Sequence, residues 1–253
     1  MSDHSPLLRG FERAGVPLEL ALGPFVRGVA GDEIVQMDVR RRNVRGRIHE
    51  RVLLWPGKGA EIGVLGADAE LNQLVLRVLE PRRKFIENRW DAKVRKTVPV
   101  VRWTSEDERR FLVGMDEAHL FVAQLTTRAT TVADAHRGLR PSVLESRPEA
   151  HRQGEWFFVP ATSDERELIG RSWHRAFLRN EPIGGLSRGM RGRPHYAEQL
   201  VRFTNRPDTA TGRAVELVRG RIRHPDHAVL ELKDWMRVFM NTEDRTVNAR
   251  WVD

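Results

Sequence analysis

The closest pair of histidines in the chain is His224 and His227, which enclose a Pro-Asp dipeptide. Two imidazoles joined by an acid could bind a divalent metal ion, and an open coordination position would then activate a water molecule. His195 is a candidate further ligand. The candidate metal ligands are therefore His195, His224, Asp226 and His227. A proline between the two histidines also suits a plain turn between strands, so a turn without metal is the alternative interpretation.

Arginine-rich segments are the second feature that could carry a function. The first lies within residues 40–47, the second within residues 82–96, and the third in a glycine-rich stretch, residues 179–193. Phosphates attract such arginines, and exposed aromatic rings can stack on bases. The predicted nucleic-acid contacts are Arg40, Arg41, Arg42, Arg45, Arg47, Arg82, Arg83, Lys84, Trp90, Arg188, Arg191 and Arg193. The alternative is a solvated rim of charge, with Phe85 and Trp90 in the core.

The composition narrows the classes of function. The chain has 253 residues, a formal net charge of +8 and no cysteine. The positive charge is mostly arginine, which favours a polyanionic partner, although a GC-rich genome would give the same bias. The lack of cysteine excludes disulfides, thiolate zinc ligands and a thiol nucleophile. No apolar run approaches the roughly 20 residues of a membrane span, and the N-terminus does not resemble a secretory signal, so we expect a cytoplasmic protein without membrane contact.

The apolar patterning predicts strands joined by turns. Ala228, Leu230 and Leu232 alternate as in a half-buried strand, and residues 235–240 form a second bulky run. A hairpin across residues 115–117 would bring Asp116, Glu117 and His119 together, where acid–base chemistry and a solvated turn are both open interpretations. Short helices are expected at residues 5–14 and 132–137 and after Thr162, and a long loop at residues 179–194. The fold class is therefore α+β, mainly antiparallel β with a few short helices.

The predicted organisation is an N-terminal β-rich half, residues 1–148, and a C-terminal β-rich half, residues 149–253, or one continuous domain. The pentapeptide Val-Arg-Gly-Arg-Ile occurs in each half, at residues 44–48 and 218–222. An ancient duplication would explain this repeat. Two unrelated strands that each need a small residue between basic ones would explain it equally.

Four segments carry a resemblance to known sequences: residues 115–125, 154–160, 193–198 and 219–227. With these segments the chain resembles a family of bacterial and archaeal proteins of unassigned function, over residues near 60 to 243. The family often has a histidine at the position of Met236, so the departure here argues against a required histidine at that place. The resemblance implies no activity, substrate or cofactor.

The sequence favours a nucleic-acid-associated cytosolic protein, with DNA or RNA as the partner, and names no reaction. One alternative is a protein–protein interaction or structural subunit, with another protein or a second copy of the chain as partner. A second alternative is a divalent-metal-dependent hydrolase or nuclease that uses residues 224–227. Apart from that metal, no cofactor is predicted.

Overall fold

The computed structural model describes residues 4–25, 35–93, 95–185, 193–207 and 214–243. It divides into two compact units. The first contains the chain up to Met115 and Leu120–His136, and the second contains Asp116–His119 and Arg137–Thr242. Antiparallel sheets dominate both units, which confirms the predicted fold class.

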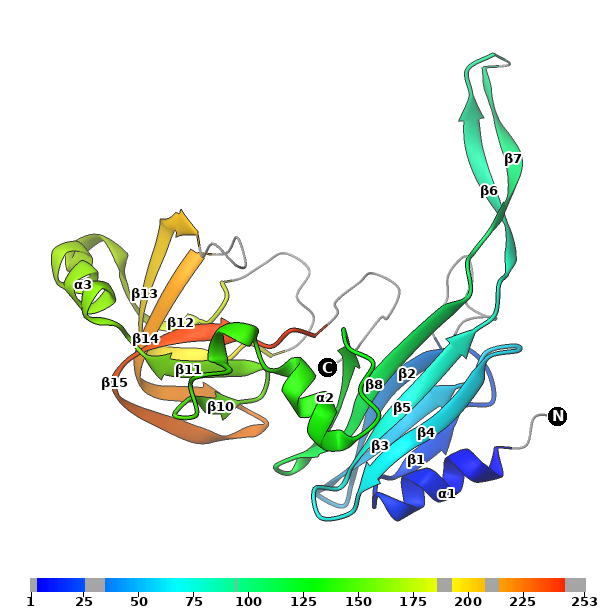
Figure 1. Ribbon diagram of the computed structural model, residues 1–253, viewed down its shortest axis with the longest axis horizontal. Helices are drawn as coiled ribbons and strands as arrows, with labels where there is room; N and C mark the ends of the chain where they lie inside the picture. Colours follow the sequence, from blue (N-terminus) through cyan, green and yellow to red (C-terminus); the bar gives the residue numbers. More distant parts are fainter. Residues whose placement is uncertain (1–3, 26–34, 94, 186–192, 208–213, 244–253) are drawn as a thin grey trace. The chain divides into compact units, whose positions relative to one another are not determined.

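The first unit begins with helix α1 (Ser5–Arg13), as predicted for residues 5–14. Its strands are β1 (Leu18–Leu20), β2 (Gln36–Val44), β3 (Arg47–Trp55), β4 (Glu61–Asp68), β5 (Gln73–Glu80), β6 (Lys84–Asp91), β7 (Lys96–Trp103), β8 (Asp107–Asp116) and β9 (His119–Leu125). They form a three-stranded sheet β1-β3-β2, a four-stranded sheet β4-β5-β8-β9 and a two-stranded ribbon β6-β7 (Figure 1).

The core of the first unit joins α1 to both larger sheets. Phe11 of α1, Leu54 of β3 and Phe111 of β8 are almost fully buried in one hydrophobic cluster. Strand β5 contributes alternate residues, Leu74, Leu76 and Val78, because side chains one apart on a strand point to opposite faces. The two sheets thus enclose one hydrophobic core, against which α1 also packs.

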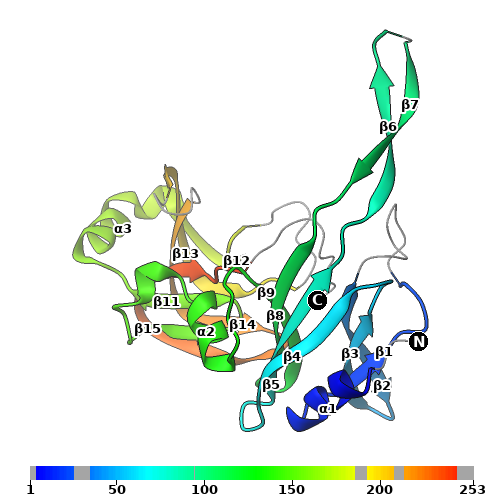
Figure 2. The same cartoon turned by 45° about the vertical axis from the view of Figure 1, so that its right-hand side comes forward.

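Strands β6 and β7 extend the β5–β8 pair into a ribbon (Figure 2). The last pair of the four-stranded sheet at this end is Glu80↔Asp107, and the first pair of the ribbon is Lys84↔Trp103. Between them, the Thr104 N–H donates to the Arg83 carbonyl at 2.8 Å. Pro81 lies in this joint, where a residue that lacks an N–H donor interrupts the ladder.

The second unit contains the remaining elements. They are α2 (Val132–Leu139), which begins in the first unit, the short 3-10 helix η1 (Ser142–Leu144), β10 (His151–Gln153), β11 (Trp156–Pro160), α3 (Ser163–Ala176), β12 (Phe177–Pro182), β13 (Tyr196–Pro207), β14 (Ala214–His224) and β15 (His227–Met240). The six strands form one antiparallel sheet in the order β10-β11-β15-β14-β13-β12.

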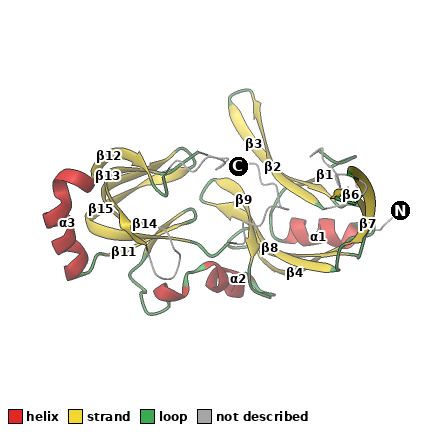
Figure 3. Cartoon of the chain, turned by 90° about the horizontal axis from the view of Figure 1, so that it is seen from above, coloured by secondary structure: helices red, strands yellow, loops and turns green. Residues whose placement is uncertain are grey.

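The six-stranded sheet has apolar residues on both faces. Phe158, Leu200 and Ile222 are buried on one face, and Val201 and Leu217 are buried on the other together with Ile169 of α3. Figure 3 shows α3 against the sheet, where it contacts β12 and β13. The predicted cap is present, since Thr162 accepts from the Glu165 N–H and Glu165 accepts from the Thr162 N–H.

One expectation about this unit needs correction. Residues 179–182 are not loop, because β12 pairs with β13 from Phe177↔Val201 to Pro182↔Tyr196. The two copies of the pentapeptide also differ in conformation: Arg45 and Gly46 form a two-residue hairpin turn, whereas Gly220 lies inside β14 at a register shift. Both glycines have a positive φ, which the hairpin turn requires at Gly46 and the β-bulge requires at Gly220.

None of the helices among the described residues is long and apolar enough to span a membrane.

Candidate metal centre

Strand register brings three histidines to one end of the six-stranded sheet. His224 ends β14 and His227 begins β15, and the two are directly paired across the Pro225–Asp226 turn. On the other side of β14, Tyr196 pairs with Arg223, which places the preceding residue, His195, beside His224. Residues opposite each other on adjacent antiparallel strands share a face, so the three side chains form one row.

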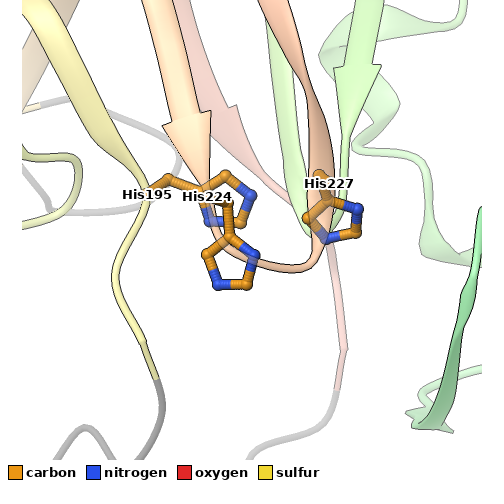
Figure 4. A group of neighbouring side chains, drawn as sticks. All are labelled: His195, His224 and His227. Atoms are coloured by element: carbon orange, nitrogen blue, oxygen red, sulfur yellow. The ribbon is translucent and has the colours of Figure 1, made fainter. Parts of the chain in front are cut away.

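The three imidazoles face one another (Figure 4). One ligand nitrogen from each ring can be chosen so that all three lie within 4.8 Å of one another. The His195 and His224 rings stack with centroids 4.2 Å apart, and His227 lies 5.0 Å from His224. His195 is 2% exposed, and neither of its ring nitrogens has a hydrogen-bond partner in the described part of the chain.

The outer nitrogens of the three rings lie near oxygen atoms. The Nδ1 atom of His195 is 3.8 Å from a Glu155 carboxylate oxygen, and Nδ1 of His227 is 3.7 Å from one of Glu117. The Nε2 atom of His224 is 2.8 Å from the Arg193 carbonyl oxygen, which can only accept a hydrogen bond, so Nε2 carries the N–H. Metal-bound histidines usually donate the N–H of the second ring nitrogen to such an oxygen. This pattern leaves Nε2 of His195 and Nε2 of His227 for a metal. Nδ1 of His224 accepts the Asp226 N–H at 3.1 Å, so it would have to exchange this hydrogen bond for the ion.

The carboxylate of Glu117 comes from the predicted β8–β9 turn, whose residues belong to the second unit. Its Oε2 atom accepts the Ala228 N–H at 2.7 Å, while its Oε1 faces His227. Arg152 holds the preceding residue, Asp116, at 3.0 Å and also donates to the Gly154 carbonyl at 2.8 Å. The turn and the β10–β11 connection are therefore tied to the histidine cluster by charged side chains.

Gly154 lets the backbone approach the cluster closely. A Cβ atom at this position would lie 2.8 Å from Nε2 of His227 and 3.2 Å from Nε2 of His195. No real Cβ atom makes the first contact without a shift of its neighbour, and the φ of +57° also disfavours other residues. The missing side chain thus lets two of the candidate ligand nitrogens lie close to the Gly154 backbone.

Burial determines the charge of these rings. Desolvation, and then the neighbouring His224 and His227, lower the pKa of His195 from 6.5 to about 3. Desolvation also lowers the pKa of His224, although the hydrogen bond to the Arg193 carbonyl opposes the shift. Both rings are therefore neutral near pH 7, which is the form that binds a metal ion.

The low pKa of His195 predicts a loss of stability in acid. Because the pKa is about 3 when folded and 6.5 otherwise, the unfolded state binds more protons between these values. Without metal, the free energy of unfolding should be highest above pH 6.5 and should fall as the pH is lowered toward 3. Urea unfolding in EDTA at pH 7.5, 6 and 5 measures this. The fall should be smaller in His195→Leu, and an equal fall in that variant would contradict the prediction.

Three imidazoles suit zinc, copper, nickel or iron better than magnesium or calcium, which prefer oxygen. Zinc–nitrogen bonds of about 2.0–2.1 Å in a tetrahedron put ligand nitrogens roughly 3.4 Å apart. The His195 and His224 rings are stacked at an interplanar angle of 16°, so they must rotate out of the stack for both nitrogens to point at one ion. Asp226, the fourth predicted ligand, is not in the group. Its carboxylate lies 3.9 Å from Nε2 of His119.

The arginines of residues 40–47 lie on the β2–β3 hairpin, and acids engage three of them. Arg40 contacts Glu19 at 2.5 Å, Arg41 contacts Glu50 at 2.6 Å, and Arg42 lies 4.0 Å from Glu19. Arg45 occupies the exposed turn, and Arg47 is exposed next to it. Within residues 40–47, Arg45 and Arg47 at the tip of the hairpin are therefore the arginines that have no acid partner among the described residues.

The basic residues of 82–96 lie on and below the β6–β7 ribbon. Arg83 is turned inward, with a side chain 12% exposed and 3.7 Å from Glu80. The Arg82 guanidinium lies over the Trp103 ring, and Lys84 and Trp90 are exposed on the ribbon. In the third segment Arg193 is exposed, whereas Arg188 and Arg191 fall outside the described residues. Nucleic-acid association stays a prediction.

Sequence reasoning missed the residues that surround the histidines. The sequence places Gly154 and Glu155 only within a segment of family resemblance, and it links Glu117 to Asp116 and His119 of its own turn but not to the histidine cluster. The signal for Glu117 was its place beside His119 in that turn, but nothing in the sequence indicates that the turn meets residues 224–228. His195 was predicted as a ligand, but nothing in the sequence explains why it should lie near His224. The β13–β14 register gives the reason.

The fold and the site together define a β-rich protein with a three-histidine cluster at the end of an antiparallel sheet. No protein-family model, curated protein or solved structure matches the chain. The resemblance to a bacterial and archaeal family therefore stays a prediction.

Proposed function

We propose that the protein binds one divalent transition-metal ion through His195, His224 and His227, and that this ion activates water for a hydrolytic reaction. The observation that carries the proposal is the convergence of three ring nitrogens from three adjacent strands around His195. Neither nitrogen of this buried ring has a hydrogen-bond partner among the described residues.

Energetics support a ligand at this place. A buried polar group without a partner costs about 1–3 kcal/mol, so two such atoms in one side chain are unfavourable unless something binds them. A metal ion would bind the inner nitrogen of His195. The Glu155 carboxylate, now 3.8 Å from the outer nitrogen, would accept a hydrogen bond from its N–H if the two groups moved closer together. The cluster thus has the chemical character of a set of metal ligands.

Three protein ligands leave a coordination position for water, whose pKa zinc lowers to about 7. Of the chain's own groups, Glu117 and Glu155 would fix the tautomers of His227 and His195. Asp226 is near enough to influence the pKa values of His195 and His224 by its charge. It is the proposed proton acceptor, and His119 at 3.9 Å would orient its carboxylate.

Metal content tests the binding half of the proposal. We expect elemental analysis to find one zinc, nickel or copper ion per chain, and a cobalt-loaded sample to show visible absorption bands of a nitrogen-bound ion. At a hundredfold excess over Kd the metal should stabilise the protein by about 2.7 kcal/mol. His195→Ala, His224→Ala and His227→Ala should each lose these effects, whereas the exposed His151→Ala should keep them.

Failure to retain any metal, with no rise in melting temperature on adding these ions, would overturn the binding half. The catalytic half is tested on the loaded protein with p-nitrophenyl acetate and bis-p-nitrophenyl phosphate. Hydrolysis that is lost on chelation and reduced in Asp226→Asn would support it. A protein that binds metal in full but hydrolyses neither class of compound would instead have a structural metal site.

A further inference from the structure

Beyond the metal centre, the β6–β7 ribbon presents an apolar face that the described chain leaves uncovered. Pairing of Ile86 with Val101 and of Trp90 with Thr97 fixes which side chains share this face. Its four large apolar residues are all exposed, by 60% at Ile86, 61% at Trp90, 51% at Val101 and 55% at Trp103. A small ribbon with such a face is marginal in water without a partner.

Basic residues lie on both faces of this ribbon, with Lys84 on the apolar face and Arg89 and Lys96 on the opposite one. The segment 82–103 has eight basic residues and two acidic ones. One of the acids, Glu87, is 3.2 Å from Arg102 on the opposite face. Lys84, Arg89 and Lys96 have no ion-pair partner within the described residues. The ribbon therefore combines exposed aromatic rings with unneutralised positive charge.

We infer that the ribbon binds single-stranded nucleic acid, whose bases stack on Trp90 and Trp103. Its phosphates contact Lys84 on the same face, and Arg89 and Lys96, which the register places on the other face of the narrow two-stranded ribbon. Charge complementarity decides against a second copy of the chain, because two ribbons with the same positive excess would repel each other. A single strand of nucleic acid matches both features of the ribbon. Its bases can stack on the exposed tryptophan rings, and its phosphates carry the negative charge that complements the basic side chains.

The spacing of the tryptophans fits a short stretch of strand. Trp103 is paired with Lys84, six residues from Trp90 along β6, which corresponds to about 20 Å at a rise of roughly 3.4 Å per residue. Ile86, Val101 and Pro99 lie between them on the same face. Arg82 covers one face of the Trp103 ring at 5.0 Å, so a base would stack on the other face and a phosphate could reach the guanidinium.

The test is fluorescence anisotropy with labelled 12-nucleotide DNA and RNA, single-stranded and duplex, from about 50 to 300 mM salt. Single strands should bind more tightly than duplexes, and Trp90→Ala and Trp103→Ala should each weaken binding by about 5- to 150-fold. Substituting Lys84, Arg89 and Lys96 by alanine together should reduce the log–log salt slope by about 2.

A matched control triple, Lys58→Ala, Arg171→Ala and Lys233→Ala, removes the same charge from exposed sites off the ribbon and should leave the affinity within twofold. Three outcomes would overturn the inference. They are no binding at low salt, binding unaffected by both tryptophan substitutions, and a concentration-dependent dimer in analytical ultracentrifugation that Trp90→Ala abolishes. Metal content should be the same in every ribbon variant, which separates this result from the metal proposal.

Discussion

Gly154→Ala is expected to abolish tight metal binding and to destabilise the protein. The new Cβ atom would lie 2.8 Å from Nε2 of His227. It would therefore push the His227 ring away from His195. The left-handed φ of +57° adds about 1–2 kcal/mol for a residue with a side chain. We expect at least a hundredfold rise in the Kd for zinc by competition with a chelating dye, and a lower melting temperature.

Gly170→Ala is the matched control for that substitution. Gly170 lies inside α3, and a Cβ atom there would have no neighbour within 4 Å. Alanine is about 1 kcal/mol more favourable than glycine inside a helix, so this variant should be slightly more stable and should keep full metal affinity. Full metal binding by Gly154→Ala would show that the space beside the two Nε2 atoms is not where the ion binds.

Glu117→Gln and Glu155→Gln are expected to weaken zinc binding by about 10- to 100-fold each, without removing a ligand. Both carboxylates lie within 3.8 Å of the outer nitrogen of a histidine, where their charge favours the N–H on that side and a lone pair on the inner side. An amide keeps the size of the side chain but removes the charge. Isothermal titration at pH 7.5 measures the loss.

Glu231→Gln serves as the control for the two carboxylates, because Glu231 is exposed on β15 away from the turn. It should bind zinc as the wild type does. If Glu117→Gln and Glu155→Gln also retain full affinity, the two carboxylates do not contribute to zinc binding. The proposed orientation of His195 and His227 is then wrong.

Local sequence determined most of the strands and helices. The alternation around Leu230 and the Pro225–Asp226 break predict the β14–β15 hairpin, because a strand exposes alternate residues and proline cannot continue the ladder. Thr162 and Glu165 predict the start of α3, because a capping box satisfies the first free N–H groups of a helix. These features depend on residues a few positions apart.

The assignment of residues 179–194 to a loop was wrong for β12 because local cues mislead there. Glycines and arginines around this segment suggest irregular structure, yet residues 177–182 form an edge strand. Pairing with β13 determines this conformation, and the partner lies about twenty residues further on. Trp90 illustrates the same limit. It is exposed because no described part of the chain covers this face of the two-stranded ribbon, and its neighbours in the sequence do not indicate this.

The sequence by itself determined that this is a β-rich, arginine-rich, cysteine-free chain in which His224 and His227 flank a turn. Only the tertiary structure decided that His195 joins them, because the β13–β14 register, and not spacing along the chain, places it beside His224. The same holds for Gly154 and Glu117, which come from segments more than seventy residues away from His227. A metal site needs ligands within a few ångströms in space, and such closeness arises between distant segments only when a sheet has formed.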